Sequence, residues 1–105
     1  DGFMYPYSTD ETPGPEGLDL QIFPNPVVSE FNMALYVDRD SELQIEFVNT
    51  LGQMMYRDVL GLNPGSQTLY FGGDVVNQAM PRSGIYFINL YLDGKFAGVK
   101  KIVKQ

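Results

Sequence analysis

The 105-residue chain contains no cysteine, histidine or tryptophan. It therefore lacks thiolate nucleophiles, zinc sites of the usual nitrogen and sulfur type, haem ligation and imidazole general bases. It also lacks a run of 18 apolar residues, so we expect no direct insertion into a membrane. These absences exclude most familiar catalytic centres, and we expect neither an enzyme nor a bound cofactor.

Basic residues are few, with 7 Lys and Arg against 13 Asp and Glu, which gives a formal net charge of −6. A field of this sign repels nucleic acid and anionic lipid, so no nucleic-acid partner is expected. The charges are unevenly distributed. Residues 1–19 include no basic residue, whereas Lys95, Lys100, Lys101 and Lys104 lie near the end.

The chain is nevertheless rich enough in apolar residues to fold, at 44% hydrophobic with seven Phe and seven Tyr. Residues 8–17 combine acid, Pro and Gly without an apolar side chain, as linkers do. We therefore divide the chain into an upstream tail and linker, 1–17, and one domain, 18–105. Because the first residue is Asp rather than Met, we expect a processed product or a domain of a longer protein.

From Leu18 onward, apolar and polar residues alternate with the period of a β-strand. The predicted strands lie near 18–23, 30–37, 42–49, 53–60, 66–71, 84–92 and 95–103. No segment has a convincing helical pattern, although 74–80 could form one helical turn. Seven short strands separated by turns predict an all-β fold, a seven-stranded antiparallel immunoglobulin-like β-sandwich.

Two features of the last predicted hairpin are specific. Strand 84–92 is apolar on both faces, which favours a central position in a sheet. Asp93-Gly94 separates it from strand 95–103 and suits a two-residue type I′ turn, in which both residues have positive φ.

Four motifs follow one another along the chain: Pro24-Asn25-Pro26, Asn49-Thr50-Leu51-Gly52-Gln53, the run 80–87 that contains Gly84-Ile85-Tyr86, and Lys100-Lys101-Ile102-Val103-Lys104. In this order they resemble the C-terminal sorting domain of the type IX secretion system of Bacteroidetes, also called the Por secretion system. The resemblance covers about residues 22–105, and it implies a seven-stranded immunoglobulin-like sandwich that acts as a non-catalytic address.

The resemblance further implies a route and a set of partners. A passenger protein would enter the periplasm through an upstream signal peptide and be delivered by this domain to the outer-membrane translocon, with a shuttle protein among the partners. A sortase-like peptidase would then remove the domain and join the passenger to anionic surface lipopolysaccharide, so that the passenger is displayed at the cell surface or secreted.

The resemblance places the recognition signal at the carboxyl end and in the strand before it. The expected signal residues are Gly84, Tyr86, Lys95, Phe96, Val99, Lys100, Lys101, Ile102, Val103 and Lys104. A terminal strand at a sheet edge offers unpaired backbone groups for strand addition, although its lysines would equally protect such an edge from aggregation. Pro24, Asn25, Pro26, Gly52 and Gly94 are expected to shape turns.

Several alternatives stay open. The domain could be an uncleaved component of a secretion or signalling apparatus, or an immunoglobulin-like adhesive or carbohydrate-binding module that uses Tyr36, Tyr56 or Tyr70 as a stacking platform. A calcium site in 38–42 is disfavoured because the loop lacks the glycine of an EF-hand. The apolar segment 3–7 and exposed strand edges make a strand-exchanged homo-oligomer possible.

Overall fold

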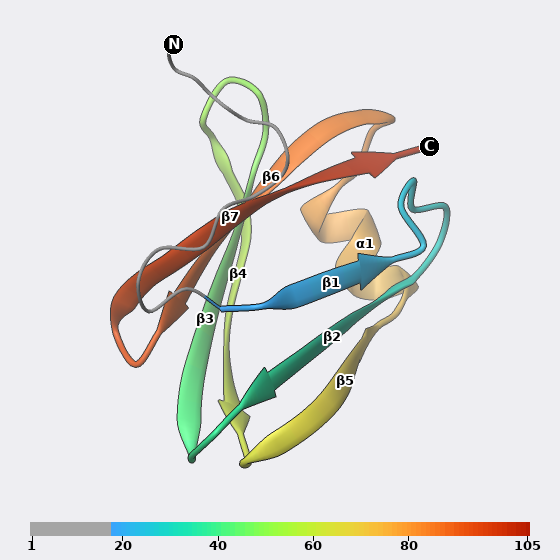
Figure 1. Ribbon diagram of the computed structural model, residues 1–105. Helices are drawn as coiled ribbons and strands as arrows, with labels where there is room; N and C mark the ends of the chain where they lie inside the picture. Colours follow the sequence, from blue (N-terminus) through green and yellow to red (C-terminus); the bar gives the residue numbers. More distant parts are fainter. Residues whose placement is uncertain (1–17) are drawn as a thin grey trace, which may run out of the picture.

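The computed structural model describes residues 18–105, so the acidic linker and the apolar segment 3–7 lie outside the described residues. Seven strands form two antiparallel sheets, which confirms the predicted all-β sandwich (Figure 1). The three-stranded sheet has the order β1 (Leu20–Phe23), β2 (Phe31–Val37) and β5 (Gly65–Phe71). The four-stranded sheet has the order β4 (Met54–Leu62), β3 (Ser41–Val48), β6 (Gly84–Leu92) and β7 (Lys95–Lys104).

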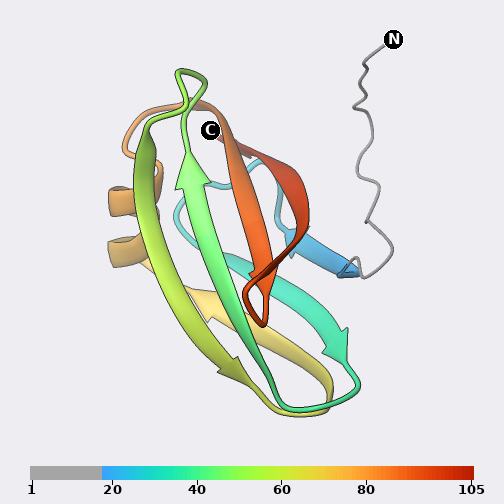
Figure 2. The same cartoon turned by 90° about the vertical axis from the view of Figure 1, so that its left-hand side faces the viewer.

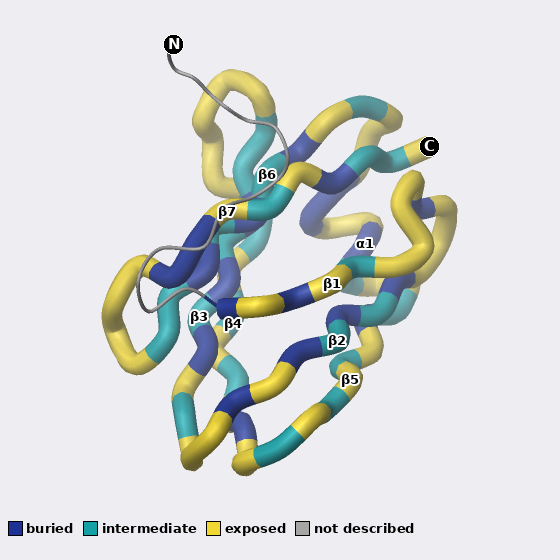
Figure 3. Tube along the Cα trace, in the orientation of Figure 1, coloured by how far each residue is buried: buried dark blue, intermediate teal, exposed yellow. Residues whose placement is uncertain are grey.

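The core lies between the two sheets and follows the alternation of the sequence. Buried and exposed residues alternate along β2, as they do along much of β1 (Figure 3). Phe31 is fully buried, stacks on Phe71 at a ring-centroid distance of 4.7 Å and lies 6.0 Å from Phe47 of the opposite sheet. Aromatic rings from both sheets therefore join the two layers at one point of the core.

The predicted β6–β7 hairpin is confirmed. β6 lies between β3 and β7, as its apolar residues indicate. Asp93 and Gly94 have φ of 52° and 83°, the positive values that a type I′ turn requires. The outer face of β6 has no covering layer within the described part of the chain, however, since the domain has a single core between two sheets.

One helix corrects the expectation that no convincing helix is present. α1 (Gly73–Ala79) lies beside β4 and β5 at one side of the sandwich (Figure 2). Val76 and Ala79 are buried, as is Met80 just after the helix. These residues have the i, i+3, i+4 spacing of an amphipathic helix. The segment is only two turns long, too short for this pattern to stand out from the alternation around it.

The β3–β4 turn explains the Asn49–Gln53 motif. The Asn49 side-chain oxygen accepts hydrogen bonds from the backbone N–H groups of Leu51 and Gln53, both at 2.9 Å. Gly52 has φ of 82° and donates to the Asn49 carbonyl. The asparagine and the glycine therefore fix this turn through backbone geometry, which leaves Leu51 exposed at its tip.

We expect Phe31→Ala to lower the free energy of unfolding by about 3–5 kcal/mol, because it leaves a cavity between the two sheets. Urea denaturation of the purified domain measures this loss. Leu51→Ala is the control: it removes a side chain that is 82% exposed, and it should change stability by less than about 0.5 kcal/mol. Equal losses for the two variants would contradict a core centred on Phe31.

Candidate functional site

The ten residues expected to form the recognition signal all lie on the β6–β7 hairpin, but not on one surface. Tyr86 and Ile102 point into the core and are buried, with Tyr86 only 5% exposed. The Tyr86 hydroxyl donates to the Arg82 carbonyl at 2.8 Å and accepts from the Arg82 N–H at 3.2 Å. Tyr86 therefore holds the loop before β6 in place and is not available to a partner.

Lys100 and Lys104 lie two residues before and after Ile102 on the same face of β7, and both are half-buried. Gly84 begins β6 with φ of 144°, a value that L side chains rarely adopt. A side chain at this position would strain the entry into the strand. Gly84, like Tyr86 and Ile102, is therefore placed where it maintains the hairpin itself.

The other side chains of the expected signal lie on the outer surface of the hairpin or at its tip. Phe96, Val99 and Lys101 are exposed and Val103 is half-buried. Cross-strand neighbours on β6 extend this surface, which we call the β6–β7 outer face; its members are Ile85, Phe87, Asn89, Tyr91, Phe96, Val99, Lys101 and Val103. Lys95 is exposed at the hairpin tip beside it.

The β6–β7 outer face is mainly apolar. Ile85 pairs with Val103, and Tyr91 contacts Phe96 edge to face at a centroid distance of 5.8 Å. Phe96 is 61% exposed, and Ile85 and Val99 are about 40% exposed. Exposed apolar groups gathered on one surface mark a site of interaction more often than scattered ones do.

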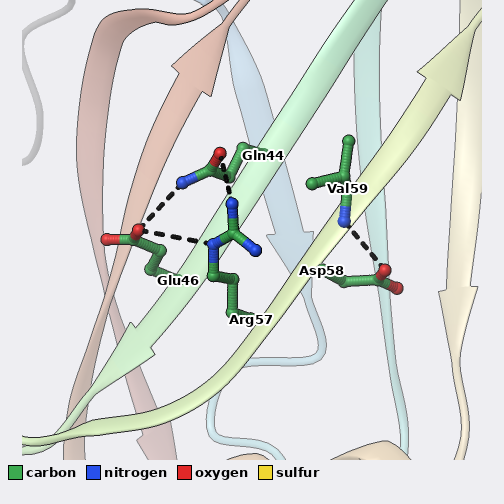
Figure 4. Close-up of polar contacts among 5 residues, drawn as sticks. All are labelled: Gln44, Glu46, Arg57, Asp58 and Val59. Carbon is green, nitrogen blue, oxygen red and sulfur yellow. Dashed lines mark hydrogen bonds and ion pairs between the residues drawn. The ribbon is translucent and has the colours of Figure 1, made fainter.

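The remainder of the same sheet surface, on β3 and β4, has a polar cluster at its centre, with the exposed apolar side chains of Val59 and Met54 beside it. Figure 4 shows Gln44, Glu46 and Arg57 connected to one another. Gln44 donates to Glu46 at 2.8 Å and accepts from Arg57 at 3.1 Å, while the Arg57 and Glu46 charges are 3.9 Å apart. On the other face of β4, where Asp58 pairs with the buried Ile45, the Asp58 carboxylate accepts from the Val59 N–H. The apolar side chains of this sheet surface are thus concentrated on the β6–β7 side, and its charged network lies on β3 and β4.

The outer edge of β7 is partly covered, which differs from the expectation of an open terminal strand. Asn25 lies beside the end of β7, where its side chain accepts from the Val103 N–H at 2.9 Å and donates to the Lys101 carbonyl at 3.3 Å. Val27 donates to the Val103 carbonyl and accepts from the Gln105 N–H, both at 2.7 Å. The loop after β1 and the end of β7 lie together in Figure 1.

These bonds give Pro24-Asn25-Pro26 a role that its sequence did not reveal. Both prolines follow cis peptide bonds. Since proline has no N–H, the Asn25 side chain supplies the groups that pair with β7. Closer to the tip of the hairpin, the Leu18 N–H donates to the Ala97 carbonyl at 3.3 Å. Within residues 18–105, these contacts leave at least the backbone of Val99 and the N–H of Lys101 open on this edge.

The three tyrosines considered as a stacking platform separate into two groups. Tyr36 and Tyr70 are exposed on the three-stranded sheet, at 58% and 63%. Tyr56 is half-buried on β4, with its ring 6.0 Å from that of Phe47. Its burial and its contact with Asp58 raise the pKa of the Tyr56 hydroxyl. Tyr56 is therefore not part of a platform with the other two.

Other kinds of site find no support within the described part of the chain. Residues 18–105 contain no group of three metal-ligating side chains, and this includes the acidic turn 38–42. The same residues contain no helix that is long and apolar enough to cross a membrane.

Comparison with known families identifies the family to which the chain belongs. The family model described as the secretion system C-terminal sorting domain matches residues 21–105. The chain belongs to this family. The sorting domain is thus a C-terminal signal for type IX secretion. Domains of this family are not catalytic, and the proteins that carry them are exported to the cell surface or secreted. No curated protein matches the chain.

Sequence reasoning missed half of the outer face of this sorting domain. The apolar residues Ile85, Phe87 and Tyr91 of β6 were used only to predict a central position for this strand and were not assigned to a surface. In a sandwich with one core, only one face of a strand is covered, so apolar residues on both faces of β6 already indicated an uncovered apolar surface.

We expect Asn25→Ala to loosen the end of β7. Loss of a hydrogen bond worth about 0.5–1.5 kcal/mol should raise the exchange rate of the Val103 amide roughly two- to tenfold. Hydrogen exchange followed by NMR measures this rate. Asn25→Asp retains the acceptor but loses the donor, so it should protect Val103 better than alanine does. Unchanged exchange in Asn25→Ala would show that the side chain does not hold β7.

Proposed function

We propose that the outer-membrane translocon recognises this sorting domain through the side chains of the β6–β7 outer face. The observation that carries the proposal is the uncovered apolar surface on the terminal hairpin of a chain that belongs to the sorting family. Phe96, Val99 and Lys101 are exposed members of this face. The proposal makes them essential for recognition by the translocon.

The composition of the outer face supports recognition. Protein interfaces are enriched in aromatic residues at their centre and carry polar groups at the rim. Tyr91, Phe96 and Phe87 supply the aromatic groups, and Lys101 and Lys95 supply positive charge. A partner with an apolar strip and neighbouring carboxylates would complement this surface, and charge attraction would accelerate its association.

The covered edge of β7 favours recognition through side chains over strand addition. An added strand needs a row of unpaired N–H and C=O groups. Asn25 and Val27 occupy both groups of Val103, Asn25 also occupies the carbonyl of Lys101, and Leu18 occupies the carbonyl of Ala97. The same contacts reduce the edge available for a strand-exchanged homo-oligomer.

The fate of the passenger follows the family in this proposal. The protein crosses the periplasm, a shuttle protein takes part in its delivery, and a sortase-like peptidase cleaves in the linker 8–17 before joining the passenger to anionic lipopolysaccharide. The acidic, Pro- and Gly-rich composition of this linker supports cleavage there, because accessible polar segments are preferred sites of proteolysis.

Substitutions on the outer face test the recognition proposal better than truncation does. Deleting residues 96–105 would remove buried Ala97 and Ile102 and unfold the domain. Val99→Ser/Lys101→Ser alters only exposed positions. With the domain fused behind a reporter in a bacterium that has type IX secretion, we expect this double variant to lower surface display at least about tenfold.

Leu51→Ser is the matched control, since it removes an exposed apolar side chain from the β3–β4 turn, outside the β6–β7 hairpin, and should leave display unchanged. Thermal unfolding of the purified domains verifies that both variants fold. Normal display of a folded Val99→Ser/Lys101→Ser variant would overturn the proposal. So would increased display of Asn25→Ala, which uncovers the edge of β7 and should have no such effect if side chains are recognised.

A further inference from the structure

The outer surface of the three-stranded sheet has a different character from the β6–β7 outer face, although neither is covered within residues 18–105. Side chains on this surface come from alternate positions of three strands. Phe23, Asn32 and Tyr70 form one row across the sheet, and Gln21, Ala34 and Thr68 form the next. Tyr36 and Ser66 form a third row. Aromatic rings thus border a patch of small and polar side chains.

A shallow depression of about 430 Å³ lies in this surface. Ala34, the smallest side chain in the central row, allows it to form, and Tyr36 lies at one side. The remaining side chains directed to the surface around it are polar: Asp19, Gln21, Ser66 and Thr68. The depression therefore offers one carboxylate, one amide and two hydroxyl groups beside an aromatic ring.

Tyr70 is held in a fixed position four residues from the row of Tyr36. Its hydroxyl donates to Glu30 at 2.5 Å, and its ring lies against Gly72, where an added Cβ would come within 3.3 Å of the ring. The bond to Glu30 also raises the pKa of the Tyr70 hydroxyl, which stays protonated at neutral pH. An aromatic ring fixed in advance binds a ligand with little further loss of entropy.

We propose that this surface, with Tyr36 and Tyr70 as stacking rings, binds a neutral oligosaccharide. The apolar C–H face of a sugar ring packs on an aromatic ring, while its hydroxyl groups exchange hydrogen bonds with carboxylate, amide and hydroxyl side chains. The outer face of β6–β7 has a different combination, since Tyr91 contacts Phe96, Ile85 pairs with Val103, and its charged groups are lysines.

The charges and the spacing define the ligand further. Asp19 lies in the depression and the whole chain carries a net charge of −6, so an anionic glycan would be repelled. Tyr36 and Tyr70 start four residues apart along the strand direction, roughly 13 Å. This is longer than one sugar ring, so a chain of several units is required to contact both.

The outer surface of the three-stranded sheet and the β6–β7 outer face belong to opposite sheets, so a glycan and a protein partner can bind at the same time. The inference does not depend on the translocon proposal. A domain that binds a glycan on one sheet would also be attached noncovalently to a carbohydrate-coated cell surface.

Calorimetric titration of the purified chain with cellohexaose, laminarihexaose, xylohexaose and mannohexaose tests the inference. We expect saturable binding of at least one of them with a Kd below about 1 mM. An alginate hexasaccharide, which carries uronate charges, should bind at least about tenfold more weakly than that ligand. Absence of saturable binding for all four neutral hexasaccharides would overturn the inference, and equally tight binding of the alginate would contradict the role of charge.

Variants locate the binding. Tyr36→Ala and Tyr70→Ala should each weaken it at least about tenfold, whereas Tyr36→Phe keeps the ring and should weaken it less than about threefold. Phe96→Ala removes an equally exposed ring from the opposite sheet and should have no effect. Thermal unfolding verifies that each variant is folded. Binding that survives both tyrosine-to-alanine changes, or that is lost in Phe96→Ala, would place the ligand elsewhere and refute the assignment.

Discussion

A single core between two sheets is the constraint on which the rest of this structure depends. Each strand directs alternate side chains into that core, where Phe31, Phe47 and Phe71 meet. Residues 18–105 form no further layer, so within this part of the chain both sheets keep an outer surface that faces away from the core. The two outer surfaces are available for binding because the core is fully packed without their side chains.

The sequence predicted the strands well because alternation is a local property. The expected ranges agree with all seven strands to within about two residues, and Asp93-Gly94 forms the expected turn. Alternation also identified the buried residues of β2 and β3. It was less informative for β6, where both faces are apolar and only the tertiary structure shows which face the core covers.

The sequence places the expected recognition residues on the last hairpin but does not indicate which way their side chains point. Motif order located these residues on the hairpin, yet it could not separate buried Tyr86 and Ile102 from exposed Phe96 and Lys101. It also could not reveal that Asn25 bonds to Val103, since that contact joins residues 78 positions apart. Hydrogen bonds over such a separation depend on the complete sheet and leave no local pattern.

The bond between Asn25 and Val103 has a consequence for protein synthesis. Its two residues are synthesised 78 positions apart. The Asn25 side chain in the loop after β1 therefore cannot form this bond until translation has passed residue 103. A polypeptide that terminates earlier would lack both this bond and one strand of the outer face. A fully folded sorting domain would then form only on chains whose preceding part has already been translated. Prematurely terminated products would lack it and would not be exported.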